Sequence, residues 1–339
     1  MYKTFIRLTI LILIAFYVAP ISALEFNEKE GCSPFKNYDA FISFLSDKNT
    51  FTPSFVFKWK FPRDQFESFH RDVTCNVIKY KVNDIQVTGY YLTPKTTQQE
   101  KRPLIVFNRG GNGSFGALNF VTLMEYLKPF VDKGFAVVAS QYRGHMRKQP
   151  ELYGKDEFGG SDVLDVHTLI DIAKSKNEVD DKRIFLYGVS RGGMMSFLVG
   201  KTRSDIKAIA VHAGVSDLEA ELEFRPEMEN VYQALIPNYQ ENKEEALKQR
   251  SVLHWIDDLP SEVPIFLVHG TEDERVSADN SIKLFKALRS KKRPVCLSLH
   301  DGEGHLFSNK NKQINEVIDW FNAVSYGDAN ETNCVNSNT

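Results

Sequence analysis

One serine stands in a sequence context that favours nucleophilic chemistry. Ser190 lies in the run Gly188-Val-Ser-Arg-Gly-Gly193, after the apolar run Ile184 to Tyr187 and before a helical pattern. A serine on a tight turn between a strand and a helix needs small neighbours, and its oxygen then projects at the end of the sheet. The backbone N–H of Arg191 would point at the oxyanion that forms when the serine attacks a carbonyl. The pattern predicts Ser190 as a nucleophile and Arg191 as an oxyanion donor.

A serine hydroxyl needs a base to take its proton, and eight histidines are available. His305 follows the last predicted strand and the loop after it, which places it at the sheet edge where parallel sheets bind ligands. We therefore expect His305 to be the base, with His300, which ends that strand, as the alternative. His212 and His269 end other strands and are expected to make structural hydrogen bonds.

The base in turn needs an acidic partner that fixes its tautomer. Asp273 follows the apolar run Ile265 to Val268 and is the best candidate, whereas Glu272 and Glu274 are expected to face solvent. Serine, aspartate and histidine would then follow three strand ends in chain order. This combination is far more specific than any one of the three motifs.

A glycine-rich loop follows the apolar run Leu104 to Phe107 and reads Asn108-Arg-Gly-Gly-Asn-Gly-Ser-Phe-Gly116. Glycine lets the backbone come close to a carbonyl oxygen, so Gly110 and Gly111 are predicted to supply the second oxyanion donor. Asn112, in the same loop, is expected to contact substrate. The loop has neither a GK[ST] nor a GxGxxG pattern, which disfavours nucleotide binding.

Short apolar runs separated by helical patterns position these residues. Buried strands alternating with helices predict an α/β fold with a mostly parallel, eight-stranded sheet and helices on both faces, preceded by an antiparallel hairpin that turns at Asn83-Asp84. The predicted strands are Val77 to Val82, Ile85 to Leu92, Leu104 to Phe107, Ala136 to Ser140, Ile184 to Tyr187, Ala208 to His212, Ile265 to Val268 and Val295 to Leu299. The predicted helices are Leu118 to Lys133, Asp162 to Lys176, Gly192 to Thr202, Asn280 to Leu288 and Ile314 to Val324.

The remaining segments predict the domain organisation. Residues 24–74 form a helical extension, 75–325 the catalytic domain with a small helical cap at 216–254, and 326–339 a C-terminal tail. The extension is rich in phenylalanine, and we expect these rings to be core. They are Phe26, Phe35, Phe41, Phe44, Phe51, Phe55, Phe57, Phe61 and Phe66.

The first 23 residues have the pattern of a signal peptide. Lys3 and Arg7 precede the apolar run Leu8 to Val18, and small residues around Ala23 suit cleavage before Leu24. The run is shorter than the ~20 residues that span a bilayer, although an uncleaved anchor is the alternative. We therefore expect export to the periplasm or secretion, with no integral membrane domain after cleavage. The net charge of −2 and the lack of a basic stripe argue against a nucleic-acid partner.

Four cysteines follow the signal segment, and an even count in an exported chain suggests disulfides. Cys32 and Cys75 both lie near the extension and are the preferred pair. Cys296 lies in an apolar strand and is interpreted as a free core thiol, although the pairing of Cys296 and Cys334 stays open. No cysteine or histidine cluster has zinc spacing, and we predict neither metal nor cofactor.

Together these motifs resemble the catalytic domain of the prolyl-oligopeptidase family of serine peptidases over roughly residues 75 to 325. The motifs that carry the resemblance are Asn108-Arg-Gly-Gly111, Gln141-Tyr-Arg-Gly144, Asp156 to Asp162 with Asp165, Gly188 to Gly193, His269-Gly-Thr-Glu-Asp273 and Gly304-His305. The resemblance implies an α/β-hydrolase fold and hydrolysis of a small peptide through an acyl-enzyme.

Two departures from the family pattern affect the expected specificity. Many members carry a β-propeller before the catalytic domain, and only about 50 residues precede the predicted hairpin here, too few for two blades of ~40–45 residues. Arg109 stands where typical members have an oxyanion-binding tyrosine, so Arg109 is expected to bind a substrate carboxylate. A serine peptidase is favoured, with a carboxylesterase or deacetylase of the same fold as the first alternative and a non-catalytic binding protein as the second.

Overall fold

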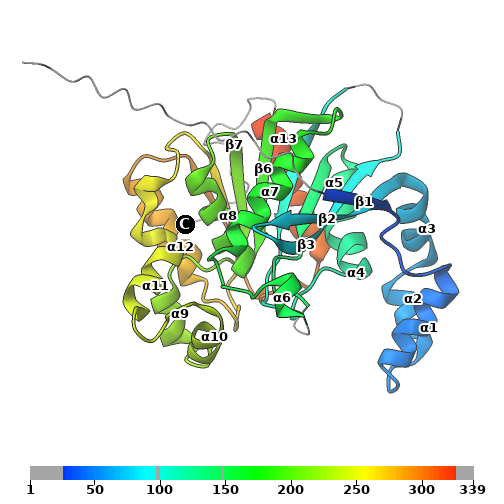
Figure 1. Ribbon diagram of the computed structural model, residues 1–339, viewed down its shortest axis with the longest axis horizontal. Helices are drawn as coiled ribbons and strands as arrows, with labels where there is room; N and C mark the ends of the chain where they lie inside the picture. The colour runs from blue at the N-terminus through cyan, green and yellow to red at the C-terminus, as the bar shows by residue number, and fades with distance from the viewer. Residues whose placement is uncertain (1–25, 97–99, 147–148, 326–339) are drawn as a thin grey trace, which may run out of the picture.

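The computed structural model describes residues 26–96, 100–146 and 149–325, so the predicted signal segment and C-terminal tail lie outside the described residues. One nine-stranded sheet in the order β1-β2-β3-β5-β4-β6-β7-β8-β9 forms the centre of the molecule (Figure 1). The strands are β1 (Phe26–Glu30), β2 (Val73–Val82), β3 (Ile85–Pro94), β4 (Arg102–Asn108), β5 (Ala136–Ser140), β6 (Val179–Val189), β7 (Ile206–His212), β8 (Ile265–Gly270) and β9 (Val295–His300).

The strands from β5 through β4, β6, β7 and β8 to β9 are parallel, and β1, β2, β3 and β5 pair antiparallel. Asn83 and Asp84, between β2 and β3, both have positive φ (49° and 65°), as a tight two-residue hairpin turn requires. The α/β-hydrolase fold is confirmed, but the predicted number of eight strands is wrong. The additional strand, β1, reads FNEKE and is largely exposed, so no apolar alternation marks it.

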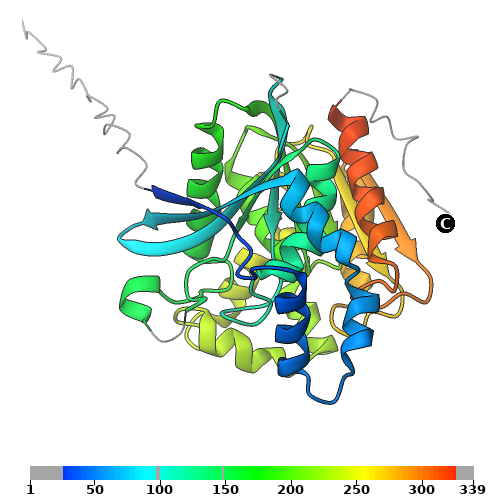
Figure 2. The same cartoon turned by 90° about the vertical axis from the view of Figure 1, so that its right-hand side faces the viewer.

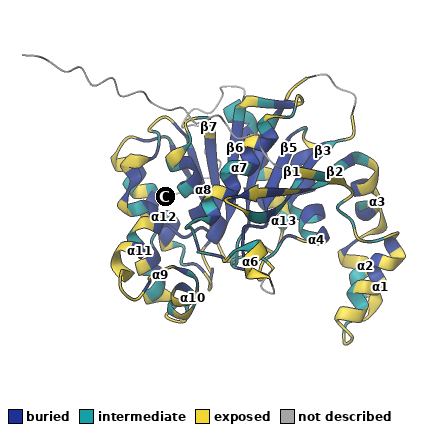
Figure 3. Cartoon of the chain, in the orientation of Figure 1, coloured by how far each residue is buried: buried dark blue, intermediate teal, exposed yellow. Residues whose placement is uncertain are grey.

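Helices cover both faces of the sheet and create two cores. One core packs helices α7, α8 and α12 against one face, and the other packs α4, α5, α13 and the N-terminal helices against the opposite face. Figure 2 shows the helix layers on either side of the sheet, and Figure 3 shows that the central strands are buried while the outer helix surfaces are exposed. The main helices here are α4 (Phe120–Thr122), η1 (Leu123–Leu127), α5 (Lys128–Asp132), α6 (Pro150–Tyr153), α7 (Asp162–Lys174), α8 (Arg191–Thr202), α12 (Asp279–Ser290) and α13 (Lys310–Ser325).

The N-terminal extension consists of β1 and three helices, α1 (Tyr38–Lys48), α2 (Ser54–Lys60) and α3 (Arg63–Asp72). Its phenylalanines divide into two sets. Rings such as Phe41 and Phe66 are buried against Phe120 of α4, with centroid distances of 5.6 Å for both. Phe26, Phe44, Phe51 and Phe55 are instead exposed. The expectation that all these aromatic rings are core is therefore wrong.

A disulfide joins Cys32, just after β1, to Cys75 in β2, as predicted, with Cα atoms 5.6 Å apart. The bond ties the extension to the first hairpin of the sheet. Cys296 is also disulfide-bonded, so the expectation of a core thiol is wrong. Cys334 lies outside the described residues.

Between β7 and β8 the chain leaves the sheet and forms the helices α9 (Leu218–Phe224), α10 (Met228–Leu235) and α11 (Lys243–Arg250), followed by two short turns, η2 (Val252–His254) and η3 (Ile256–Asp258). These helices occupy the segment where the polar sequence predicted a cap. Of the helices described here, none combines the length and the apolar character needed to cross a membrane.

Candidate active site

Ser190 lies on the sharp turn between β6 and α8. Its φ of 59° is unusual for a residue with a side chain, and the turn is held by its backbone N–H, which donates to the His212 carbonyl at 2.8 Å. The next helix approaches closely, because a Cβ on Gly192 would lie 1.9 Å from the Asn108 carbonyl oxygen. The small residues in this motif are therefore required by contact, as expected for a serine presented at the edge of the sheet.

Asp273, after β8, is the partner of His305. The Asp273 carboxylate accepts a hydrogen bond from His305 Nδ1 at 2.8 Å, and its other oxygen accepts from the backbone N–H groups of Arg275 (2.8 Å) and Val276 (3.0 Å). A second imidazole, that of His269, lies 3.2 Å away through Nε2. Burial acts to raise the pKa of Asp273, but the hydrogen bonds from the two histidines and the charge of His305 lower it well below its usual range. Asp273 is thus a buried, ionised acceptor.

The hydrogen bonds distinguish His305 and Asp273 from the alternative candidates for the base and the acid. His300 lies 2.9 Å from Glu316 and belongs to a different hydrogen-bonded group from Asp273. Glu272 and Glu274 are both exposed, as expected. Of the residues considered for the acid and the base, Asp273 and His305 are the pair that the structure brings together.

The other two strand-end histidines make hydrogen bonds to the Asp273–His305 pair. His269 Nε2 also faces the Val276 carbonyl at 3.0 Å, which can only accept, so this nitrogen carries the proton; Nδ1 then accepts from Ser281 Oγ at 2.7 Å. His212 donates to the His305 carbonyl at 3.0 Å, and burial lowers the pKa of His212 to about 3. Sequence reasoning expected structural hydrogen bonds for both, but did not indicate that His269 contacts Asp273.

Ser190 and His305 line one cavity of about 260 Å³, whose wall includes Gly110 and Gly111 of the glycine-rich loop. Gly111 has φ +70°, and a Cβ there would lie 2.3 Å from the Phe115 carbonyl oxygen. Most of the remaining wall is apolar or aromatic. It includes Phe107, Phe115, Leu118, Tyr126, Val189 and Leu306, with Thr122 and Arg275 among the polar residues. A Cβ on Gly110 would lie 3.1 Å from Ser190 Cβ, so the loop approaches the serine closely, as predicted from its glycines.

Arg109 does not have the role expected for it. Its side chain is about 1% exposed, and its guanidinium donates to the backbone carbonyls of Gln141 (2.6 and 3.0 Å), Gly113 (2.9 Å) and Gly110 (3.0 Å). Since these carbonyls occupy its donors, we assign Arg109 to the support of the glycine-rich loop. This corrects the expectation that it binds a substrate carboxylate.

A buried ion-pair network connects the same loop to the helix after Ser190. The Arg191 side chain donates to both carboxylate oxygens of Asp156 at 2.8 Å, contacts Asp162, and reaches the Gly111 carbonyl at 3.0 Å. Asp156 in turn accepts from the Gly113 N–H at 2.6 Å. Burial acts to raise the pKa of Asp156, but the charge of Arg191 lowers it. Both carboxylates stand in the Asp156 to Asp162 motif, although sequence alone did not assign their roles.

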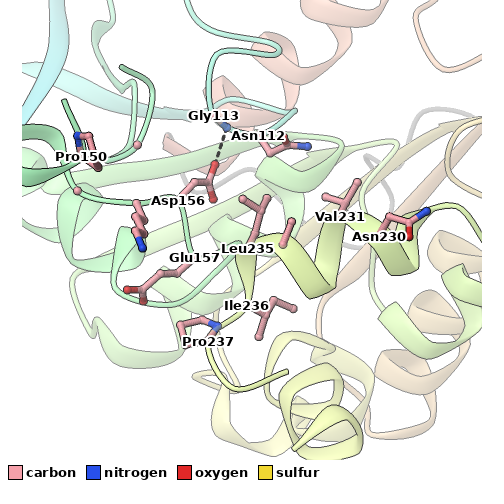
Figure 4. Close-up of a pocket in the computed structure, with 14 residues that line it drawn as sticks. Asn112, Gly113, Pro150, Asp156, Glu157, Asn230, Val231, Leu235, Ile236 and Pro237 are labelled. Carbon is pink, nitrogen blue, oxygen red and sulfur yellow. Dashed lines mark hydrogen bonds between the residues drawn. The ribbon is translucent and has the colours of Figure 1, made fainter. Parts of the chain in front are cut away.

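A second, larger cavity of about 760 Å³ lies on the other side of this loop. Asn112 and Gly113 form one wall, the segment from Pro150 to Glu157 another, and Val231, Leu235 and Pro237 of the cap a third. Figure 4 shows these side chains around the hydrogen bond from Gly113 to Asp156. Asn112, predicted to contact substrate, thus faces this neighbouring cavity.

A mostly parallel sheet with a serine on the strand–helix turn, and with an aspartate and a histidine after two later strands, defines an α/β-hydrolase. Residues 121–327 match the model of the prolyl oligopeptidase family. The chain therefore belongs to this family and is a hydrolase of the serine-peptidase type.

Individual relatives agree with this assignment. The chain is 25% identical over 259 residues to the uncharacterized peptidase YtmA of Bacillus subtilis, covering 76% of this chain and 96% of that one. It spans 29–40% of the length of other curated peptidases it matches. The acylaminoacyl peptidase of Pyrococcus horikoshii shares the fold, with a TM-score of 0.63 at 20% identity over 77% of this chain and 43% of that one.

Proposed function

We propose that this protein is an exported serine peptidase that cleaves small peptides through Ser190, His305 and Asp273. The observation that carries the proposal is the 2.8 Å hydrogen bond between His305 Nδ1 and buried Asp273, with His305 and Ser190 on the wall of one cavity. The family and the relatives named as peptidases favour an amide as the scissile bond.

In the proposed reaction, Ser190 Oγ attacks the substrate carbonyl while His305 Nε2 takes the hydroxyl proton. The tetrahedral intermediate collapses when His305 gives that proton to the leaving nitrogen, which releases the amine and leaves an acyl-serine. Water, deprotonated by His305, then cleaves the ester. Asp273 keeps Nδ1 protonated through the 2.8 Å hydrogen bond, so Nε2 is the nitrogen that exchanges the proton.

The oxyanion is stabilised by backbone N–H groups at Arg191 and at Gly110 or Gly111. Arg191 begins helix α8 directly after Ser190, and both glycines line the Ser190 cavity. The Arg191 side chain joins α8 to the glycine-rich loop by donating to the Gly111 carbonyl, and Arg109 braces the loop from within by donating to the Gly110 and Gly113 carbonyls. Donors fixed in this way need no reorganisation as charge develops on the carbonyl oxygen.

In this proposal the signal segment is cleaved before Leu24, and the mature protein acts outside the cytoplasm. The Cys32–Cys75 bond supports this proposal, because structural disulfides persist mainly in oxidising compartments. N-terminal sequencing of the protein from periplasm and culture medium tests it, and a chain that retains residues 1–23 in the cytoplasm would contradict it.

The nucleophile is tested with a fluorophosphonate probe. We expect the probe to label wild type, and Ser190→Ala to abolish labelling and lower turnover by several orders of magnitude. Ser114→Ala, which removes an exposed serine of the glycine-rich loop, is the matched control and should label normally. Labelling of the Ser190→Ala variant would show that another residue is the nucleophile.

The bond type is tested by comparing aminoacyl amides, short peptidyl amides and short-chain esters side by side. We expect the peptidyl amides to be hydrolysed with the highest kcat/KM. If only the esters react at the Ser190 site, the enzyme is a carboxylesterase or deacetylase of the same fold, and the proposal of a peptidase is wrong.

A further inference from the structure

The tip of the N-terminal extension carries an unusual concentration of exposed aromatic rings. Phe51, in the connection between α1 and α2, is 100% exposed, Trp59 of α2 is 83% exposed and Phe55 is 69% exposed. Phe44 of α1 adds a fourth ring at 45%. We call these four residues the aromatic tip. Rings of this size are costly to leave in water, so their exposure at one place calls for a partner.

Lysines surround these rings. Lys48 ends α1, and Lys58 and Lys60 flank Trp59 in α2, and all three are exposed. Between residues 47 and 60 these three cations face a single acid, Asp47, which gives the segment a net charge of +2. Long lysine side chains can lie along an apolar surface while their ammonium groups contact anionic headgroups.

The spacing places the rings and the cations on one structure. Phe55 and Trp59 are four residues apart on α2 and therefore share a helix face, and Phe51 lies just before that helix. Helices α1 and α2 and their connection form a helical hairpin. Its opposite side is held by buried Phe41, Phe61 and Phe66, whose rings pack together at 5.5–5.6 Å. The rings thus project from a supported hairpin.

We propose that the aromatic tip docks the protein on a lipid bilayer that carries anionic headgroups. Tryptophan is enriched at membrane–water interfaces, and interfacial helices combine an apolar face with lysines. A second copy of this chain fits less well, because the four exposed rings offer roughly 500–700 Å². A standard protein interface buries about 800 Å² per partner.

The position of the aromatic tip determines which other part of the hydrolase faces the lipid when the tip docks. Figures 1 and 2 both place the connection between α1 and α2 and cap helix α10 on the lower side of the molecule, although Figure 1 shows them at opposite ends of its long axis. Helix α10 contributes Val231 and Leu235 to the cavity beside the glycine-rich loop. If this lower side faces the bilayer when the tip docks, the α10 side of the cap faces the lipid surface as well.

The test uses the full chain and vesicles of phosphatidylglycerol and phosphatidylcholine in equal amounts, compared with phosphatidylcholine alone. We expect sedimentation with the anionic vesicles, weakened by high salt. Combining Phe51→Ser, Phe55→Ser and Trp59→Ser should weaken binding by about tenfold or more. Combining Lys48→Glu, Lys58→Glu and Lys60→Glu should remove the preference for anionic lipid.

Two controls separate the tip from other contributions. Leu164→Ser, which removes a leucine that is 43% exposed on α7, should bind like wild type. All variants share the same N-terminal segment, so their differences report the hairpin alone. Trp255 and Trp320 are buried, so quenching of tryptophan fluorescence by brominated lipid reports Trp59.

The proposal is overturned if wild type does not bind anionic vesicles or if brominated lipid does not quench the fluorescence of Trp59. It is equally overturned if the triple serine variant binds as tightly as wild type. It is also overturned if the substitutions instead abolish a dimer seen by sedimentation. Ser190→Ala should bind vesicles normally, so failure of lipid binding and failure of the proposed peptidase activity are distinguishable.

Discussion

At the scale of single residues, the Asp273 carboxylate is held by four hydrogen-bonding partners. It accepts from two backbone N–H groups and contacts both His305 and His269, and its side chain has no exposed surface. These contacts fix the rotamer of Asp273, and through it the orientation of the His305 ring. A neutral amide in the same place would keep the shape of the site but not its preference for a protonated Nδ1.

We predict that Asp273→Asn lowers kcat/KM by about 10⁴ while the fold is retained, because His305 then adopts the wrong tautomer. Glu272→Gln and Glu274→Gln, which change the exposed acids on either side, should leave the rate within a factor of two or so of wild type. Steady-state kinetics on one peptidyl amide compares all three. A large loss from either glutamine variant would move the role of the acid away from Asp273.

Arg109 shows where residue types mislead. An arginine in a glycine-rich loop resembles a ligand-binding group, since its fork of donors suits carboxylates. The same donors also suit backbone carbonyls, and here they reach Gln141, which is 32 residues away in the chain. Sequence could place Ser190, Asp273 and His305 because each follows its own apolar strand. It could not reveal this contact between two loops.

At the scale of the elements, the attachment of the cap depends on a buried carboxyl group. Glu221 of α9 is about 2% exposed, and one oxygen accepts from Asn280 Nδ2 of α12 at 3.2 Å. Asn280 also accepts from the backbone N–H groups of Ser216 and Asp217, just before α9. Burial, only partly offset by Asn280 and by the charge of Arg225, raises the pKa of Glu221 to about 7.

This shift makes the stability of the fold depend on pH. As pH rises above about 4.5 the unfolded chain loses the Glu221 proton, whereas the folded protein keeps it until about pH 7. The free energy of unfolding should therefore fall between these values, by up to about 3 kcal/mol from this group, and then become level. Glu221→Gln should remove this contribution.

Urea unfolding of wild type and variant at several pH values between about 5 and 8 measures the difference. Glu223→Gln, an exposed neighbour on the same helix, is the control and should follow wild type. Identical pH profiles for wild type and Glu221→Gln would mean that Glu221 is ionised in the folded state throughout this range.

Strands and helices were predictable from the sequence where the burial of their side chains produces a regular pattern of apolar residues. The parallel strands, such as β6 and β8, are buried on both faces and therefore appear as short apolar runs. Strand β1 pairs through its backbone while its side chains stay largely exposed, so it has no such signature. The exposed rings of α1 and α2 were missed for the converse reason, because apolar residues normally indicate core.

At the scale of the whole molecule, strand pairing, aromatic packing and a disulfide join the extension to the hydrolase domain. Strand β1 pairs with β2 from Phe26 opposite Tyr80 to Glu30 opposite Asn76. The ring of Phe120 lies within 5.1–5.7 Å of several rings of the extension. The Cys32–Cys75 disulfide joins them covalently. Together they make the extension part of the domain, so loosening it should affect the stability of the whole chain.

We predict that Cys32→Ser combined with Cys75→Ser lowers the free energy of unfolding by roughly 3–4 kcal/mol, because the bond closes a loop with a sequence separation of 43 residues. Ser190, Asp273 and His305 lie outside the extension, so probe labelling of the folded variant should be unchanged. Urea unfolding of the oxidised wild type and the double variant measures the effect. Equal stability of the two, with Cys32 and Cys75 recovered as separate alkylated thiols from wild type, would show that backbone pairing and the Phe120 cluster hold the extension without the bond.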